Sequence, residues 1–107
     1  MGQVGGAGRS LYSASKFALE GLTKCMAIEL APHGIRVNTL CPTWIETAMT
    51  VPLLDDPKTR DWVLGKIKLG RLGRMEELSG PLLLLASDAS SLMTGGAVVV
   101  DGGWTAG

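Results

Sequence analysis

The sequence predicts an α/β fold built on a parallel β-sheet. Residues 35–41 and 97–100 are almost uninterrupted apolar or β-branched runs, as expected for strands that are buried on both faces of a sheet. A helical segment lies between them; it starts at Glu76 and Glu77 and runs to about residue 87. Strands of this kind that are joined through a helix form a parallel pair with helices on the sheet faces.

Residues 11–30 have the spacing of a long helix. Apolar side chains recur at three- and four-residue intervals and cover more than one stripe of the helix surface. Ser10 is a candidate N-cap, and Gly34 suits a left-handed C-terminal cap after Pro32. We expect this helix to be covered on two sides, by a sheet and by a partner subunit.

The other segments are less regular. The first nine residues are rich in glycine but lack the third glycine of a dinucleotide-binding fingerprint, so they predict a flexible loop. Residues 43–74 predict a long loop with a short helix over 57–69. Pro81 lies inside the last helical segment and predicts either a kink or a late start there. Two strands and two main helices cannot cover both sheet faces, so residues 1–107 are expected to be one end of a larger domain.

Composition excludes several classes of protein. Ten Lys and Arg residues balance ten Asp and Glu residues, and no basic run offers a surface for nucleic acid. No apolar stretch approaches the roughly 20 residues of a membrane span, and no secretion signal opens the chain, which predicts a cytoplasmic protein. Cys25, Cys41 and the single histidine, His33, lack metal-ligand spacing, so we expect free thiols and no metal site.

Tyr12 and Lys16 are the candidate catalytic pair. They lie four residues apart in the predicted helix and therefore one turn apart on the same face. Tyr12 falls in the first turn, where the helix dipole favours negative charge, and a nearby ammonium group also favours the phenolate. Such a phenol could exchange a proton with an alcohol or a carbonyl. A solvated Tyr–Lys pair at a helix start, with no catalytic role, is the alternative.

Several segments together extend this interpretation. YSASKFAL (12–19), IRVN (35–38), PTWIET (42–47), LASD (85–88), TGG (94–96) and VDGG (100–103) occur in order along nearly the whole chain. They resemble the active-site helix, the last two strands and the cofactor loop of the short-chain dehydrogenase/reductase family. The resemblance implies the C-terminal part of a Rossmann-like, doubly wound parallel sheet that binds NAD or NADP.

The resemblance also implies roles for individual residues. Tyr12 would be the general acid/base, and Lys16 would activate it and hydrogen-bond the nicotinamide ribose. Pro42, Thr43, Ile45 and Thr47 would line the nicotinamide end of the cofactor site. Pro42 would lie beside the ring, the Ile45 backbone would hold the carboxamide, and Thr47 would add its hydroxyl. A hydroxyl that makes only a local turn is the alternative for Thr47.

Some positions depart from the family pattern or leave it open. Thr43 stands where the family has glycine, and a β-branched residue would be strained there if the loop needs a positive φ. Trp44, Trp62 and Met49 lie in the family's substrate segment; they suit either an apolar substrate or packing. We expect Arg71 to be structural and to pair with a carboxylate.

The family's glycine-rich cofactor loop, asparagine and serine would all precede Tyr12, outside this sequence. The resemblance therefore implies a small alcohol or carbonyl substrate and a dimer or tetramer, but little activity for residues 1–107 alone. It does not distinguish NAD from NADP, and it does not identify the substrate. The alternative function is a non-catalytic module that self-associates or docks on a complete relative.

Overall fold

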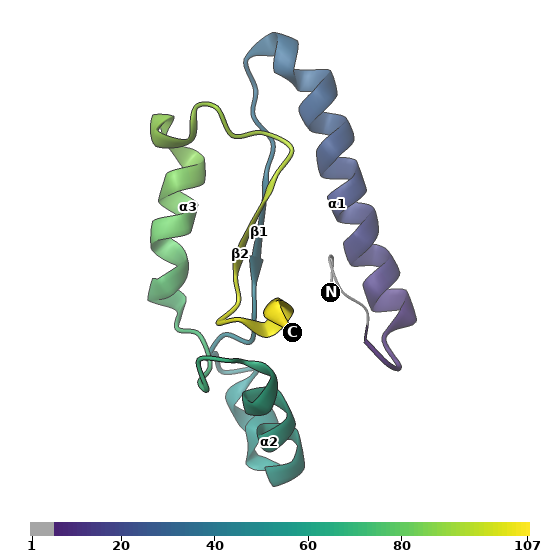
Figure 1. Ribbon diagram of the computed structural model, residues 1–107, viewed down its shortest axis with the longest axis vertical. Helices are drawn as coiled ribbons and strands as arrows, with labels where there is room; N and C mark the ends of the chain where they lie inside the picture. The colour runs from purple at the N-terminus through teal and green to yellow at the C-terminus, as the bar shows by residue number, and fades with distance from the viewer. Residues whose placement is uncertain (1–5) are drawn as a thin grey trace. The chain divides into compact units, whose positions relative to one another are not determined.

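The computed structural model describes residues 6–107 (Figure 1). In this part of the chain, the α-helices are α1 (Ser10–Leu30), α2 (Pro57–Lys66) and α3 (Ser79–Ala86), and the strands are β1 (Thr39–Pro42) and β2 (Ala97–Val100). The chain forms two compact units. Unit 1 comprises the chain up to Leu40 together with Leu84–Val98, and unit 2 comprises Cys41–Leu83 together with Val99–Gly107.

β1 and β2 pair directly and in parallel, which confirms the predicted sheet. The Thr39 N–H donates to the Gly96 carbonyl at 3.0 Å, and the Thr43 N–H donates to the Val100 carbonyl at 3.2 Å. Both partners advance by the same number of residues between these two bonds, as parallel strands require. The two arrows accordingly run in the same direction in Figure 1.

The first strand is shorter than predicted: at residues 35–38 one backbone bond to the facing segment remains, from the Gly95 N–H to the Val37 carbonyl at 2.7 Å, and side chains make the others. The Arg36 guanidinium donates to the carbonyls of Leu85, Ser87 and Met93, at 3.1, 3.1 and 3.2 Å. The Asn38 amide group also donates to the Met93 carbonyl, at 2.8 Å, and accepts the Gly96 N–H at 3.1 Å. This segment is therefore held by side-chain hydrogen bonds together with one backbone bond, and regular pairing begins only at Thr39.

α1 confirms the predicted long helix, with two differences. Ser10 is the first helical residue rather than the N-cap; Arg9 occupies the cap and makes no side-chain cap bond. Within the described chain only Thr23 and Ala27 of α1 are buried, and the expected cover of its apolar surface by a partner subunit stays a prediction. At the other end, Gly34 has φ 72°, which confirms the left-handed cap.

The two shorter helices differ from prediction at their ends. α2 begins at Pro57, as expected, behind an Asp56 cap whose carboxylate accepts the Lys58 N–H, but it stops at Lys66 rather than at residue 69. A 3₁₀ turn over Met75–Leu78 precedes α3. Pro81 is the third residue of α3, where its missing N–H costs no intrahelical bond. Of the two outcomes predicted from Pro81, a kink or a late start, the structure shows the late start.

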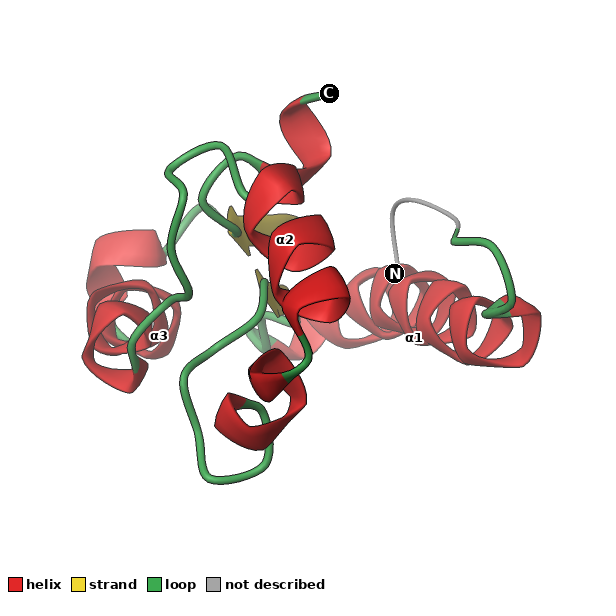
Figure 2. Ribbon diagram, turned by 90° about the horizontal axis from the view of Figure 1, so that it is seen from below, coloured by secondary structure: helices red, strands yellow, loops and turns green. Residues whose placement is uncertain are grey.

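The core of unit 2 includes Val63 of α2 and Ile67, the residue directly after that helix. Val63 and Ile67 are buried, and Ile67 packs so closely on Gly102 that a Cβ there would lie 2.7 Å from its Cγ2 atom. The rings of Trp62 and Trp104 meet edge to face, with centroids 5.5 Å apart, where the C-terminal turn reaches α2 (Figure 2). Trp62 thus has a packing role inside this unit. None of the described helices is long and apolar enough to cross a bilayer.

Candidate functional site

Tyr12 and Lys16 lie together at the start of α1, in unit 1. The Lys16 ammonium sits over the Tyr12 ring, with Nζ 5.4 Å from the ring centroid, so the predicted pairing on one helix face is confirmed. Tyr12 is 47% exposed. The Ser15 hydroxyl donates to the Tyr12 carbonyl at 2.7 Å, which fixes the backbone of this turn. The phenol is therefore accessible and has a cation as its immediate neighbour.

The segment that follows β1 belongs to unit 2. Pro42, the last residue of β1, is exposed. None of the described non-glycine residues has a positive φ, so Thr43 is accommodated without the strain that a glycine-type conformation would impose. Its Oγ1 atom is buried and has no hydrogen-bond partner in the described part of the chain. A β-branched residue therefore fits the loop at this position.

Ile45 forms a parallel bridge with Gly73. Its neighbours pair with Gly73: the Gly73 N–H donates to the Trp44 carbonyl at 2.9 Å, and the Glu46 N–H donates to the Gly73 carbonyl at 2.7 Å. In a parallel bridge of this kind, the N–H and carbonyl groups of Ile45 itself point to the opposite side. The carbonyl accepts the Thr50 hydroxyl, whereas the N–H has no acceptor among residues 6–107.

Thr47 forms the local turn that sequence reasoning left open for it. Its N–H donates to the Thr50 hydroxyl at 2.9 Å, and its own hydroxyl lies 3.2 Å from the same oxygen. The Thr50 N–H also approaches the Thr47 hydroxyl, at 3.3 Å. Thr50 was not among the predicted site residues, because a lone threonine in a polar loop gives no sequence signal of its partners.

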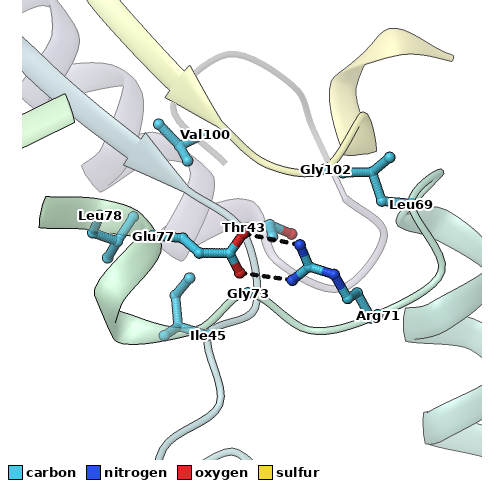
Figure 3. A pocket seen from close by; sticks show the side chains of 9 residues that line it. All are labelled: Thr43, Ile45, Leu69, Arg71, Gly73, Glu77, Leu78, Val100 and Gly102. Carbon is cyan, nitrogen blue, oxygen red and sulfur yellow. Dashed lines mark hydrogen bonds and ion pairs between the residues drawn. The ribbon is translucent and has the colours of Figure 1, made fainter. Parts of the chain in front are cut away.

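Arg71 pairs with a carboxylate, as predicted. Its guanidinium makes a two-pronged ion pair with the Glu77 carboxylate, with N–O distances of 2.6 and 2.9 Å (Figure 3). Glu77 also accepts the Arg74 N–H at 3.0 Å. The Arg71 hydrogen bonds, followed by the bond from the Arg74 backbone, lower the pKa of Glu77 from its ordinary value of 4.5 to about 2.

This ion pair borders a cavity of about 100 Å³ in unit 2. Figure 3 shows the side chains of Thr43 and Ile45 at the same cavity. Gly73 lines it as well, and a Cβ on Gly73 would lie 2.6 Å from the Cδ1 atom of Ile45. The Arg71–Glu77 pair therefore shapes the turn whose Gly73 pairs with the segment around Ile45.

The remaining candidates have simpler positions. Met49 is exposed, and neither Cys25 nor Cys41 forms a disulfide in the described part of the chain. Among residues 6–107, no group of three or more His, Cys, Asp or Glu side chains could hold a metal ion.

Comparisons with known proteins identify relatives across nearly the whole chain. Residues 1–105 match a protein-family model described as enoyl-(acyl carrier protein) reductase. The chain is 45% identical over 93 residues to the 2-dehydro-3-deoxy-D-gluconate 5-dehydrogenase of Bacillus subtilis (strain 168), a match that covers 87% of this chain and 37% of that enzyme.

Solved structures of dehydrogenases also resemble this chain. A 4-hydroxyisoleucine dehydrogenase complexed with NADH superposes with a TM-score of 0.91 and 36% identity, covering 99% of this chain and 44% of the other. A gluconate 5-dehydrogenase from Burkholderia cenocepacia J2315, in complex with NADP and tartrate, gives a TM-score of 0.84 and 40% identity, with 90% and 38% coverage. The chain thus spans less than half the length of the relatives it matches.

Proposed function

Because the chain belongs to the short-chain dehydrogenase/reductase family, we propose that it supplies the proton-transfer residues and the nicotinamide end of the cofactor site in an NAD(P)-dependent oxidoreductase. The reaction would interconvert a secondary alcohol and a ketone. The observation that carries this proposal is the contact between the Lys16 ammonium and an accessible Tyr12 phenol at the first turn of α1.

Tyr12 would move the proton. In alcohol oxidation its phenolate oxygen takes the hydroxyl proton while the carbinol C–H bond breaks, and in ketone reduction its phenol returns that proton to the carbonyl oxygen. When bound, the dinucleotide would supply the hydride acceptor or donor that balances this proton. Lys16, whose ammonium group lies over the ring, would stabilise the negative charge that forms on the Tyr12 oxygen.

The residues after β1 fit the nicotinamide carboxamide. A carboxamide offers one carbonyl acceptor and two N–H donors. The Ile45 N–H, which has no acceptor among residues 6–107, is the matching donor, and the Thr47 hydroxyl lies two residues further along the same loop. The exposed Pro42 offers an apolar surface without a donor. Thr43, with its buried hydroxyl, would support the loop from the side of the cavity.

The relatives bear on the class of substrate and on the choice between NAD and NADP. The relatives include a sugar-acid dehydrogenase and a hydroxyamino-acid dehydrogenase, and their structures hold NADH or NADP. We therefore propose a small hydroxylated molecule as the substrate class and either dinucleotide as cofactor. A homo-oligomer is proposed as well, since apolar side chains on α1 and α3 are exposed in the described chain.

Titration with NADH and NADPH, followed by nicotinamide fluorescence, tests the proposal. We expect saturable binding of at least one of them. The Tyr12→Phe variant should keep that binding and lose about 10²- to 10⁴-fold in kcat, measured with the substrate that the unsubstituted protein oxidises fastest in a panel of polyols and sugar acids. The Lys16→Met variant should lose both binding and turnover, whereas Lys58→Met, a matched change on α2, should lose neither.

The same titration separates the second candidate function. The exposed apolar residues of α1, Leu11 and Ile28 among them, favour a module that only self-associates or docks on a complete relative. Absence of a response to millimolar NADH and NADPH, together with concentration-dependent association, would support the module and contradict the oxidoreductase.

A further inference from the structure

The Thr50 hydroxyl joins several groups of the loop that contains Ile45 and Thr47. Its oxygen lies 2.5 Å from the Ile45 carbonyl oxygen, accepts the Thr47 N–H at 2.9 Å and lies 3.2 Å from the Thr47 hydroxyl. All these residues belong to unit 2. Thr50 itself is partly buried and directly precedes the 3₁₀ turn Val51–Asp55.

The direction of these bonds follows from counting protons. A threonine hydroxyl has one proton and two lone pairs. The Thr47 carbonyl already accepts the N–H groups of Thr50 and Val51, at 3.2 and 3.0 Å, whereas the Ile45 carbonyl has no other partner in the described chain. The Thr50 proton therefore goes to Ile45, and its lone pairs accept from Thr47.

This bond completes the support of one peptide group. The peptide that joins Ile45 to Glu46 is held at both ends, by Thr50 at its carbonyl and by the Gly73 carbonyl at its N–H. The preceding peptide, between Trp44 and Ile45, is held only at its carbonyl, by the Gly73 N–H, so its own N–H is left available. Because the plane of the Ile45–Glu46 peptide is fixed, the plane of the Trp44–Ile45 peptide can rotate only over a limited range.

We propose that Thr50 is a positioning residue for the nicotinamide loop: its hydroxyl orients the Ile45 N–H and the Thr47 hydroxyl toward the carboxamide without touching the cofactor. This inference rests on the proposed function, in which those two groups bind the carboxamide. The chemistry requires a hydroxyl at residue 50, so serine can replace threonine there and valine cannot.

Binding of the reduced dinucleotide tests the cofactor part of the inference. Thr50→Val should raise the Kd for NADH or NADPH about tenfold, and should raise the cofactor KM by more than it lowers kcat. Thr50→Ser should restore values close to those of the unsubstituted protein. Thr59→Val is the matched control, because that hydroxyl bonds to Asp56 at the start of α2 and should leave the Kd unchanged.

Two results of this titration have different meanings. Equal Kd values for the unsubstituted protein and Thr50→Val would overturn the positioning role and leave the proposed function intact. Failure of the unsubstituted protein to bind either dinucleotide would overturn the proposed function, and the cofactor role of Thr50 with it.

Amide hydrogen exchange without cofactor tests the loop separately. The Thr47 N–H should exchange faster in Thr50→Val than in Thr50→Ser or Thr59→Val, because valine cannot accept its bond. Unchanged far-ultraviolet circular dichroism would show that the variant is folded. Equal exchange rates at Thr47 in all four proteins would overturn the inference whether or not a dinucleotide binds.

Discussion

At the scale of single residues, the Glu77 carboxylate accepts hydrogen bonds from the Arg71 side chain and from the Arg74 backbone. These bonds, the Arg71 bonds first, hold its pKa at about 2 instead of 4.5. Since the folded-state pKa is depressed, the stabilisation is fully present above about pH 4.5 and is lost as the pH falls through about 2.

We therefore expect Glu77→Gln to remove part of the acid sensitivity. Between pH 4.5 and about 2, the urea midpoint of the unsubstituted protein should fall more steeply than that of Glu77→Gln. Glu76→Gln, at the exposed neighbouring position, should follow the unsubstituted protein. Parallel pH profiles for the unsubstituted protein and Glu77→Gln would contradict this assignment.

Gly73 is a second residue at which a single substitution has a defined expected effect. A methyl group there would lie 2.6 Å from the Ile45 Cδ1 atom, so Gly73→Ala must displace Ile45. We expect a loss of about 1–3 kcal/mol in the free energy of unfolding, measured in urea, and weaker dinucleotide binding. Gly65→Ala in α2 is the control: it has open space and should gain about 0.5–1 kcal/mol. A neutral Gly73→Ala would show that this contact relaxes freely.

At the scale of elements, the sequence pattern predicted those helices and strands that depend on residues close together along the chain. The 97–100 strand and the long helix were found from apolar spacing, and Pro81 predicted either a kink or the late start that α3 has. The strand predicted to begin at residue 35 begins at Thr39, and in the residues before it Arg36 and Asn38 bond to carbonyl groups more than 45 residues away along the chain. No window of the sequence contains both partners of such a bond.

The same distinction between local and long-range interactions applies to the candidate site. Tyr12 and Lys16 were found because helix geometry alone places them together. The partners of Ile45 were not, because Gly73 pairs with this segment across a long loop and Thr50 acts through a turn whose shape the composition does not specify.

The long-range hydrogen bonds of Arg36 can be tested by a single substitution. Its guanidinium reaches three carbonyl groups, two at the end of α3 and one before β2, which a lysine ammonium cannot match in a planar fork. Arg36→Lys should lower the free energy of unfolding by about 1–3 kcal/mol and speed amide exchange at Gly95. Arg9→Lys, an exposed change, should alter neither. Equal urea midpoints for the two variants would contradict this role.

At the scale of the whole molecule, large apolar side chains remain in contact with solvent on α1 and α3. Leu11 is 87% exposed, Ile28 75% and Leu83 68%. Surfaces of this kind lower their free energy by association, because each buried square ångström of apolar area contributes about 25 cal/mol. The pairing of the two short strands adds little to the stability of the fold, because two-stranded sheets are at best marginally stable alone.

We expect the protein to associate with itself through these helices. Its sedimentation coefficient should rise with concentration, and Leu22→Glu on α1 or Leu83→Glu on α3 should shift the distribution toward smaller species, because a buried carboxylate without a partner is costly. Leu53→Glu tests an equally exposed leucine outside both helices and should leave the distribution unchanged. If all three variants sediment like the unsubstituted protein, the interface lies elsewhere, and the apolar surface of α1 does not account for self-association.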